Sequence, residues 1–106
     1  MSNENRLELH EKLCTILGSR NVYFQPPESI KLQYPCIVYS RSRYEKQNAD
    51  NAAYTVLARY TVTVVYKDPD SDLPIKLLTE FQRITFDRNY KVDNLNHDVF
   101  DLYYKN

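Results

Sequence analysis

Residues 54–67 read YTVLARYTVTVVYK, a run in which apolar and polar side chains alternate. Such alternation is typical of a β-strand with one buried face, because successive side chains of a strand point to opposite sides. At about 3.3 Å per residue this strand would extend roughly 40 Å, whereas a domain of about 100 residues has a radius of gyration of about 13 Å. One end of the strand is therefore expected to project and to need a partner surface. The buried face is expected to carry Tyr54, Val56, Ala58, Tyr60, Val62, Val64 and Tyr66.

The composition predicts one soluble domain. The chain has 106 residues, of which 42% are hydrophobic, and its fourteen basic residues balance fourteen acidic ones. This length supports a core without metal or disulfides, so residues 1–106 are not divided further. The balanced charge gives no general attraction to nucleic acid or anionic lipid, and no apolar run approaches the roughly 20 residues that span a bilayer. Cys14 and Cys36 are predicted to be buried, reduced thiols.

The scarcity of glycine excludes some functions. Gly18 is the only glycine, whereas loops that hold phosphate groups need several glycines for close approach of the backbone. Neither a P-loop nor a dinucleotide-binding fingerprint is therefore present. No cofactor is expected.

The remaining pattern predicts an α+β domain with the order α-β-β-β-α-β-β. Two helices are expected on one face of an antiparallel sheet, and a long hairpin is expected to project from it. The first helix spans about 3–17 and ends at Gly18. The second begins near Pro74, which suits a first helical turn. Strands are expected at 21–24, 36–44, 54–67, 84–92 and about 97–104.

Two finer expectations concern the second half of the chain. The second helix should bury a stripe made of Ile75, Leu77, Leu78 and Phe81. The strand at 84–92 should turn Ile84, Phe86, Tyr90 and Val92 inward, with Arg88 interrupting that set. The segment Asp68-Pro69-Asp70-Ser71-Asp72 is expected to form a turn and to cap the second helix.

Residues 41–59 form the expected hairpin arm, in which basic and aromatic residues are mixed. Three interpretations are open: a solvated arm, a contact with another protein, and a platform for single-stranded nucleic acid. The balanced net charge argues against nucleic acid. Nucleic acid would be bound by a basic strip with interleaved tyrosines, made of Arg41, Arg43, Lys46 and Arg59 with Tyr44, Tyr54 and Tyr60. The candidate residues for a subunit interface are Arg41, Arg43, Tyr44, Lys46, Tyr54 and Arg59.

Other polar groups have simpler structural explanations. His97 and Asp98 are adjacent, but neighbouring strand residues face opposite ways and would not share a cleft. His10 is the only other histidine, so a histidine metal site cannot be built. Aspartates at 68, 70 and 72 have the spacing of a calcium loop but lack its glycine and terminal glutamate. No catalytic or metal site is predicted, and the chain is not expected to be an enzyme.

Three segments together resemble small tail-completion proteins, of the tail-terminator or head–tail joining type, from long-tailed phages and prophages of Gram-positive bacteria. They are Asn21-Val22-Tyr23-Phe24-Gln25-Pro26-Pro27 leading to Tyr34-Pro35-Cys36-Ile37-Val38-Tyr39; Tyr60-Thr61-Val62-Thr63-Val64 with Asp68-Pro69-Asp70-Ser71; and Phe86-Asp87-Arg88 through Asp93-Asn94-Leu95-Asn96-His97-Asp98 to Tyr103-Tyr104. The resemblance covers most of Asn21 to Tyr104.

The resemblance implies a structural role in the virion. Proteins of this type form a ring, usually of six identical subunits, that caps the tail tube and docks on the head connector. The expected partners are thus copies of the chain itself, the tail tube protein and a head connector or neck protein. The protein would be made in the bacterial cytoplasm and end in the tail or neck of the virion. The alternatives are another neck or head-completion component and a small nucleic-acid-binding α+β module.

Overall fold

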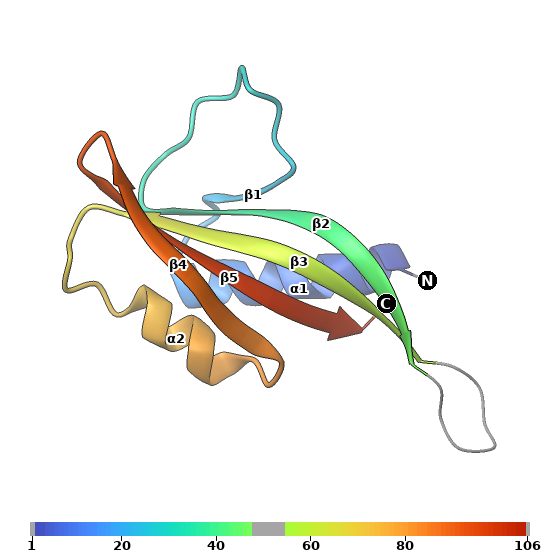
Figure 1. Cartoon of the computed structure of the whole chain (residues 1–106). Coiled ribbons are helices and arrows are strands. Elements are labelled where there is room, and N and C mark those ends of the chain that lie inside the picture. Colours follow the sequence, from blue (N-terminus) through green and yellow to red (C-terminus); the bar gives the residue numbers. More distant parts are fainter. Residues whose placement is uncertain (1, 48–54, 106) are drawn as a thin grey trace.

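The computed structural model describes residues 2–47 and 55–105, which form two helices and five strands (Figure 1). The α+β class is confirmed. Along the chain the elements are α1 (Ser2–Leu17), β1 (Val22–Phe24), β2 (Cys36–Gln47), β3 (Thr55–Tyr66), α2 (Leu73–Glu80), β4 (Ile84–Val92) and β5 (Leu95–Lys105).

The five strands form one sheet in the order β1-β2-β3-β5-β4. The pairs β2·β3, β3·β5 and β4·β5 are antiparallel, whereas β1 runs parallel to β2. The expectation of an entirely antiparallel sheet was therefore wrong at one edge. The physical reason is the connection between β1 and β2, which is long enough to return the chain to the same end of the sheet before β2 begins.

The main core lies between the helices and one face of the sheet, which we call the helix face. From Ala58 onward, β3 buries its even-numbered residues here, as the alternation predicted. Tyr54, the first residue of that predicted set, lies outside the described residues. The core also contains Leu9 and Leu13 of α1 and Leu77 of α2. Both helices contact this one cluster, in agreement with the expected layering.

The ends of the helices follow from local chemistry. Gly18 ends α1 with a φ of 82°, a left-handed conformation that glycine adopts without strain, and its N–H donates to the carbonyl of Cys14 at 2.8 Å. In α2, Pro74 lies in the first turn as expected. The N-cap residue Asp72 makes no capping hydrogen bond; instead Ser71 Oγ accepts from the N–H of Leu73 at 3.3 Å.

The predicted apolar stripe of α2 was wrong in part. Leu73, Leu77 and Phe81 are buried, but Ile75 is 61% exposed and Leu78 is also exposed. The short helix meets the core along one side only, because it lies at the end of the sheet nearest β4. Ile75, two positions before Leu77, and Leu78, one position after it, therefore point away from the sheet.

The opposite face of the sheet carries a smaller apolar cluster. Cys36, Val65 and Leu95 are buried there, and partly buried side chains, including Val38, pack around them. Cys14 lies in the main core. Both cysteines are free and buried, as predicted, and burial raises the pKa of the Cys36 thiol to about 11.

Strand β4 departs most from its sequence pattern. A β-bulge between Phe86 and Arg88 shifts its register against β5. Phe86 pairs with Phe100, which faces the helices, but Tyr90 pairs with His97 on the opposite face. The predicted inward set was therefore wrong in part: Ile84 packs against the main core, but one extra residue in the bulge turns Tyr90 and Val92 to the opposite face.

The molecule is elongated, with principal extents of 51, 26 and 21 Å. The pairing of β2 with β3 continues to Gln47 and Thr55, beyond the pairing of Leu57 with Lys105 that ends β5. In Figure 1 the two ribbons curve away together past the C-terminal end of β5. Of the candidate interface residues that the structure describes, Lys46 lies in this distal part, whereas Arg41, Arg43, Tyr44 and Arg59 lie where β3 still pairs with β5.

Candidate assembly surface and neighbouring sites

A β-bulge divides the candidate interface residues between the two faces of the sheet. The register of β2 against β3 shifts between Arg41 and Arg43. Arg41 pairs with the core residue Tyr60, and Tyr44 pairs with Ala58, so both lie on the helix face, as does Lys46. Arg43 pairs with Arg59 on the opposite face. The hypothesis that these residues form one basic strip was therefore wrong, because they lie on two faces of the sheet. Tyr54 lies outside the described residues.

On the helix face, Arg41 lies among aromatic rings. Its guanidinium carbon is 5.4 Å from the ring centre of Tyr44, 5.6 Å from that of Phe24 and 5.7 Å from that of Tyr60. Cation–π attraction accounts for this position. Its Nε atom is buried and has no hydrogen-bond partner among the described residues. Arg41 therefore belongs to the packed surface of the domain, and its contact with Phe24 could not be predicted from the sequence.

Tyr39 connects this surface to α1 through two polar contacts. Its hydroxyl accepts a hydrogen bond from Arg6 at 3.3 Å and lies 2.7 Å from Nδ1 of His10. Burial raises the pKa of Tyr39. The pKa of His10 is lowered, first by burial and then by Arg6 and Arg20. A protonated Tyr39 hydroxyl that donates to a neutral His10 satisfies all of these observations. His10 was predicted to lie on the helix surface, but it is only partly exposed.

On the opposite face, ion pairs neutralise the arginines. Arg59 lies 3.0 Å from a carboxylate oxygen of Asp101, and this hydrogen bond raises the pKa of Arg59. Arg43 forms an exposed ion pair with Glu45, at 2.9 Å, within its own strand. The basic charge of Arg43 and Arg59 is thus largely compensated on this face. This arrangement weakens the nucleic-acid interpretation, which needs uncompensated basic side chains along one surface.

The edge strand β4 carries exposed apolar residues on both faces of the sheet, which the sequence did not indicate. Phe86, Tyr90 and Val92 are 51%, 40% and 49% exposed. Arg88 forms an ion pair with the adjacent Asp87 at 2.8 Å, and the ring of Tyr90 stacks on His97 with centroids 4.7 Å apart. The alternating pattern had placed these apolar residues in the core. Arg88 interrupts the alternation at the bulge, but the hydrophobic pattern does not show that the residues after it change face, so their exposure could be found only from the structure.

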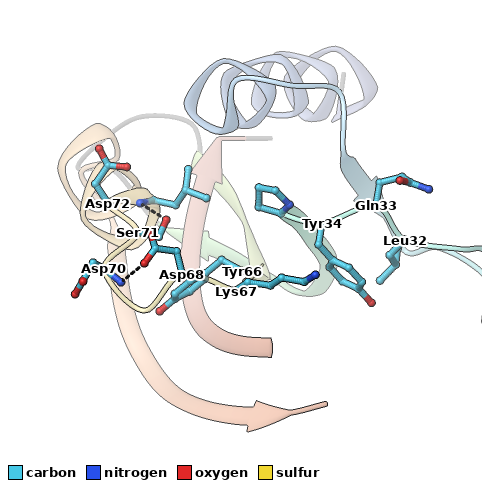
Figure 2. A pocket seen from close by; sticks show the side chains of 11 residues that line it. Leu32, Gln33, Tyr34, Tyr66, Lys67, Asp68, Asp70, Ser71 and Asp72 are labelled. Carbon is cyan, nitrogen blue, oxygen red and sulfur yellow. Dashed lines mark hydrogen bonds between the residues drawn. The ribbon is translucent and has the colours of Figure 1, made fainter. Parts of the chain in front are cut away.

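A pocket of about 730 Å³ opens between the loop before β2 and the loop before α2 (Figure 2). Apolar atoms from Leu32, Tyr34, Pro35 and Leu73 form part of its wall. Its polar lining is Gln33, Lys67, Asp68, Asp70, Ser71 and Asp72, with Tyr66 also contributing. The pocket lies at the end of the sheet opposite the distal arm (Figures 1 and 2).

The aspartates of this pocket take part in local structure. Asp68 Oδ1 accepts a hydrogen bond from the N–H of Asp70 at 3.0 Å, and Asp72 lies 3.6 Å from the ammonium group of Lys76. In the described residues no group of histidine, cysteine and carboxylate side chains has an arrangement that could hold a metal ion. The calcium-loop spacing therefore corresponds to a turn that precedes a helix.

The carboxylate of Asp98 is buried next to Tyr66, one of the residues that line the pocket. Asp98 is 6% exposed and accepts hydrogen bonds from the hydroxyl of Tyr66, at 2.8 Å, and from the side-chain amide of Asn89. Burial, followed by this hydrogen bond, raises the pKa of Tyr66 to about 12. His97 faces the other way, with Nδ1 3.1 Å from the carbonyl of Leu95. The prediction that His97 and Asp98 do not share a cleft is thus confirmed.

The fold and surfaces define a small α+β domain with an elongated sheet and exposed strand edges. Compared with protein families, curated proteins and solved structures, the chain shows no match. Within the described residues, none of the helices has the length and apolar character needed to cross a membrane.

Proposed function

We propose that the chain is a structural subunit of the phage virion, a tail-completion or tail-terminator protein. It would form a ring, with six copies in the virion, that caps the tail tube and joins it to the head connector. The sequence segments that resemble this class support the proposal. The chain would act through surfaces that bind copies of itself, the tube protein and a neck protein.

The observation that carries the proposal is the continuation of β2 and β3 beyond the end of β5. The pairing of β3 with β5 ends at Leu57 and Lys105, whereas the pairing of β2 with β3 continues to Gln47 and Thr55. Extended strands of this kind expose backbone donors and acceptors that a neighbouring protein can pair. An assembly subunit uses such a feature, because a ring needs two different complementary surfaces on each copy.

Sizing by light scattering across a protein concentration series tests the proposal. The wild type is expected to grow to a discrete ring, which electron microscopy can count by its symmetry. A variant in which residues 46–52 are replaced by a short turn is expected to lose this growth. The matched control replaces residues 28–31, in the loop between β1 and β2, by a turn of similar length.

Two results would contradict the proposal. One is a wild type that stays monomeric both alone and on tail tubes isolated from phage. The other is an arm-shortened variant that assembles as well as the wild type. Binding of single-stranded nucleic acid that weakens with salt and on replacement of Arg41 and Arg43 would favour the nucleic-acid alternative.

A further inference from the structure

The sheet has two unpaired edges on opposite sides, formed by β4 and by the distal half of β2 (Figure 1). Within residues 2–47 and 55–105, β4 pairs only with β5, and β1 covers β2 only from Ile37 to Tyr39. Gln25 extends this cover slightly, because its side-chain oxygen accepts from the N–H of Arg41 at 3.2 Å. Beyond Arg41, none of the described strands pairs with the outer edge of β2. Open edges of this kind are sites where another strand adds.

The two edges are compatible in direction. Successive antiparallel pairings from β2 through β3 and β5 to β4 make β4 run opposite to β2. Two copies that lie side by side in the same orientation therefore present β4 and β2 to each other as an antiparallel pair. Their helices would lie on the same side of the continued sheet. The contact joins two different surfaces, so it can repeat from copy to copy and close a ring.

The side chains along both edges are compatible in face and charge. Arg88 and Tyr90 lie on the face of β4 opposite the helices, and Arg43 and Glu45 lie on the same face of β2. Each edge carries an exposed ion pair within its own strand, Asp87 with Arg88 and Arg43 with Glu45. Such exposed pairs contribute little to stability, so they can exchange partners at small cost when two edges meet.

We propose that β4 of one copy pairs with β2 of the next in the antiparallel register that sets Arg88 opposite Glu45. The same register sets Tyr90 opposite Arg43 of the neighbouring copy. Opposite charges then face each other across the strands, and a guanidinium lies beside an exposed aromatic ring. The partner at the open edge of β2 is a second copy of this chain, because β4 matches β2 in strand direction, in the sheet face of its side chains and in charge. This inference rests on the proposed self-assembly and adds the strands and residues that make the contact.

Disulfide cross-linking tests the register. Two variants, Glu45→Cys and Arg88→Cys, are mixed under mild oxidation at a concentration where the wild type assembles. Facing strand residues have Cα separations of about 4.5–5.5 Å, within the range that a disulfide bridges. A covalent dimer is expected from the mixture, because each variant supplies one side of the contact. The native cysteines are buried and should not compete.

The matched control for cross-linking is Thr85→Cys mixed with Glu45→Cys. Thr85 is an exposed residue of β4, but three positions along a strand from Arg88 correspond to about 10 Å. Little dimer is expected from this mixture. Equal yields from Thr85 and Arg88, or no dimer from either, would overturn the register.

Charge reversal provides a second test that does not depend on cysteine. Arg88→Glu alone and Glu45→Arg alone are each expected to weaken assembly about tenfold or more, because like charges then face each other. The double variant Arg88→Glu/Glu45→Arg is expected to recover assembly. Circular dichroism of each variant checks that the fold is retained. If the wild type forms rings and the double variant remains as weak as the single ones, the edge contact is refuted while ring formation itself still stands.

Discussion

At the scale of single residues, polar side chains join α1 to the sheet above an apolar core. Arg6 and His10 contact the hydroxyl of Tyr39, and the hydroxyl of Tyr104 donates to Glu8. Tyrosine suits these positions because its ring packs in the core while its hydroxyl reaches a polar partner. The abundance of tyrosine, ten of 106 residues, is thus explained in part by contacts between layers.

The contact between His10 and Tyr39 predicts a pH dependence of stability. The pKa of His10 is lowered in the folded protein, mainly by burial. The folded state then binds fewer protons than the unfolded state as pH falls below about 6.5, the ordinary histidine value, so protonation destabilises the fold. This contribution is fully present above that value and is lost as pH falls through the folded pKa. His10→Gln is expected to reduce the loss of stability between pH of about 7.5 and about 5.5, measured by urea unfolding.

A control for the His10 experiment is Thr79→Gln, a change at an exposed helical position that keeps both histidines. It should retain the wild-type pH dependence. An unchanged pH dependence in His10→Gln would show that this side chain titrates equally in the folded and unfolded states.

The buried carboxylate of Asp98 makes Tyr66 a stabilising residue. Tyr66→Phe removes the hydroxyl that donates to Asp98 and leaves a buried acceptor short of one partner. The free energy of unfolding is expected to fall by about 1–3 kcal/mol. Tyr90→Phe removes the same atom from an exposed ring and should change the free energy of unfolding by less than about 0.5 kcal/mol. Denaturant unfolding of both variants checks the difference, and equal effects would argue against a structural role for the Tyr66–Asp98 bond.

At the scale of elements, β-bulges decide which residues share a face. The bulge in β2 separates Arg41 from Arg43, and the bulge in β4 separates Phe86 from Tyr90. Each inserts one residue into a strand whose side chains alternate with a period of two, so every later side chain changes face. Both bulges lie in strands at or near a sheet edge, where bulges are common. The bulge in β2 also divides the candidate interface residues between two surfaces.

The helix α2 offers a direct test of how burial is distributed within one element. Leu77→Ala is expected to lower the free energy of unfolding by about 2–5 kcal/mol, because Leu77 is fully buried and its loss leaves a cavity. Ile75→Ala lies on the same helix but removes a side chain that is mostly exposed, and it should cost less than about 1 kcal/mol. Thermal and denaturant unfolding of both variants measure the difference. Comparable losses would mean that Ile75 is covered in solution, for example by another copy.

At the scale of the whole molecule, the sheet is longer than the body that covers it. The helices and the main core lie over its central part, while the distal ends of β2 and β3 continue beyond β5 (Figure 1). The stability of the monomer and its assembly into a ring are therefore expected to depend on different parts of the chain. The variant shortened at residues 46–52 should keep the melting temperature of the wild-type monomer, because its change lies away from the described core, and should lose only the growth seen by light scattering. A large drop in melting temperature would instead make the arm part of the folding unit.

Much of the fold could be predicted because it depends on local chemistry. The alternation from Ala58 to Tyr66 predicted a strand that buries its even-numbered residues, and Gly18 predicted the end of the first helix. The turn at Asp93 and Asn94 follows the same logic, since both residues adopt positive φ angles that asparagine and aspartate tolerate. In each case the relevant interactions lie within a few residues along the chain.

The features that could not be predicted from the sequence depend on contacts between segments that are distant along the chain. The parallel pairing of β1, the exposure of β4 and the placement of Arg41 among Phe24, Tyr44 and Tyr60 each result from which strands are neighbours. A hydrophobic pattern states that a side chain prefers burial, but it does not state whether a partner is present to bury it. Strand order and the two bulges therefore determined which apolar residues are buried and which remain on the open edges of the sheet.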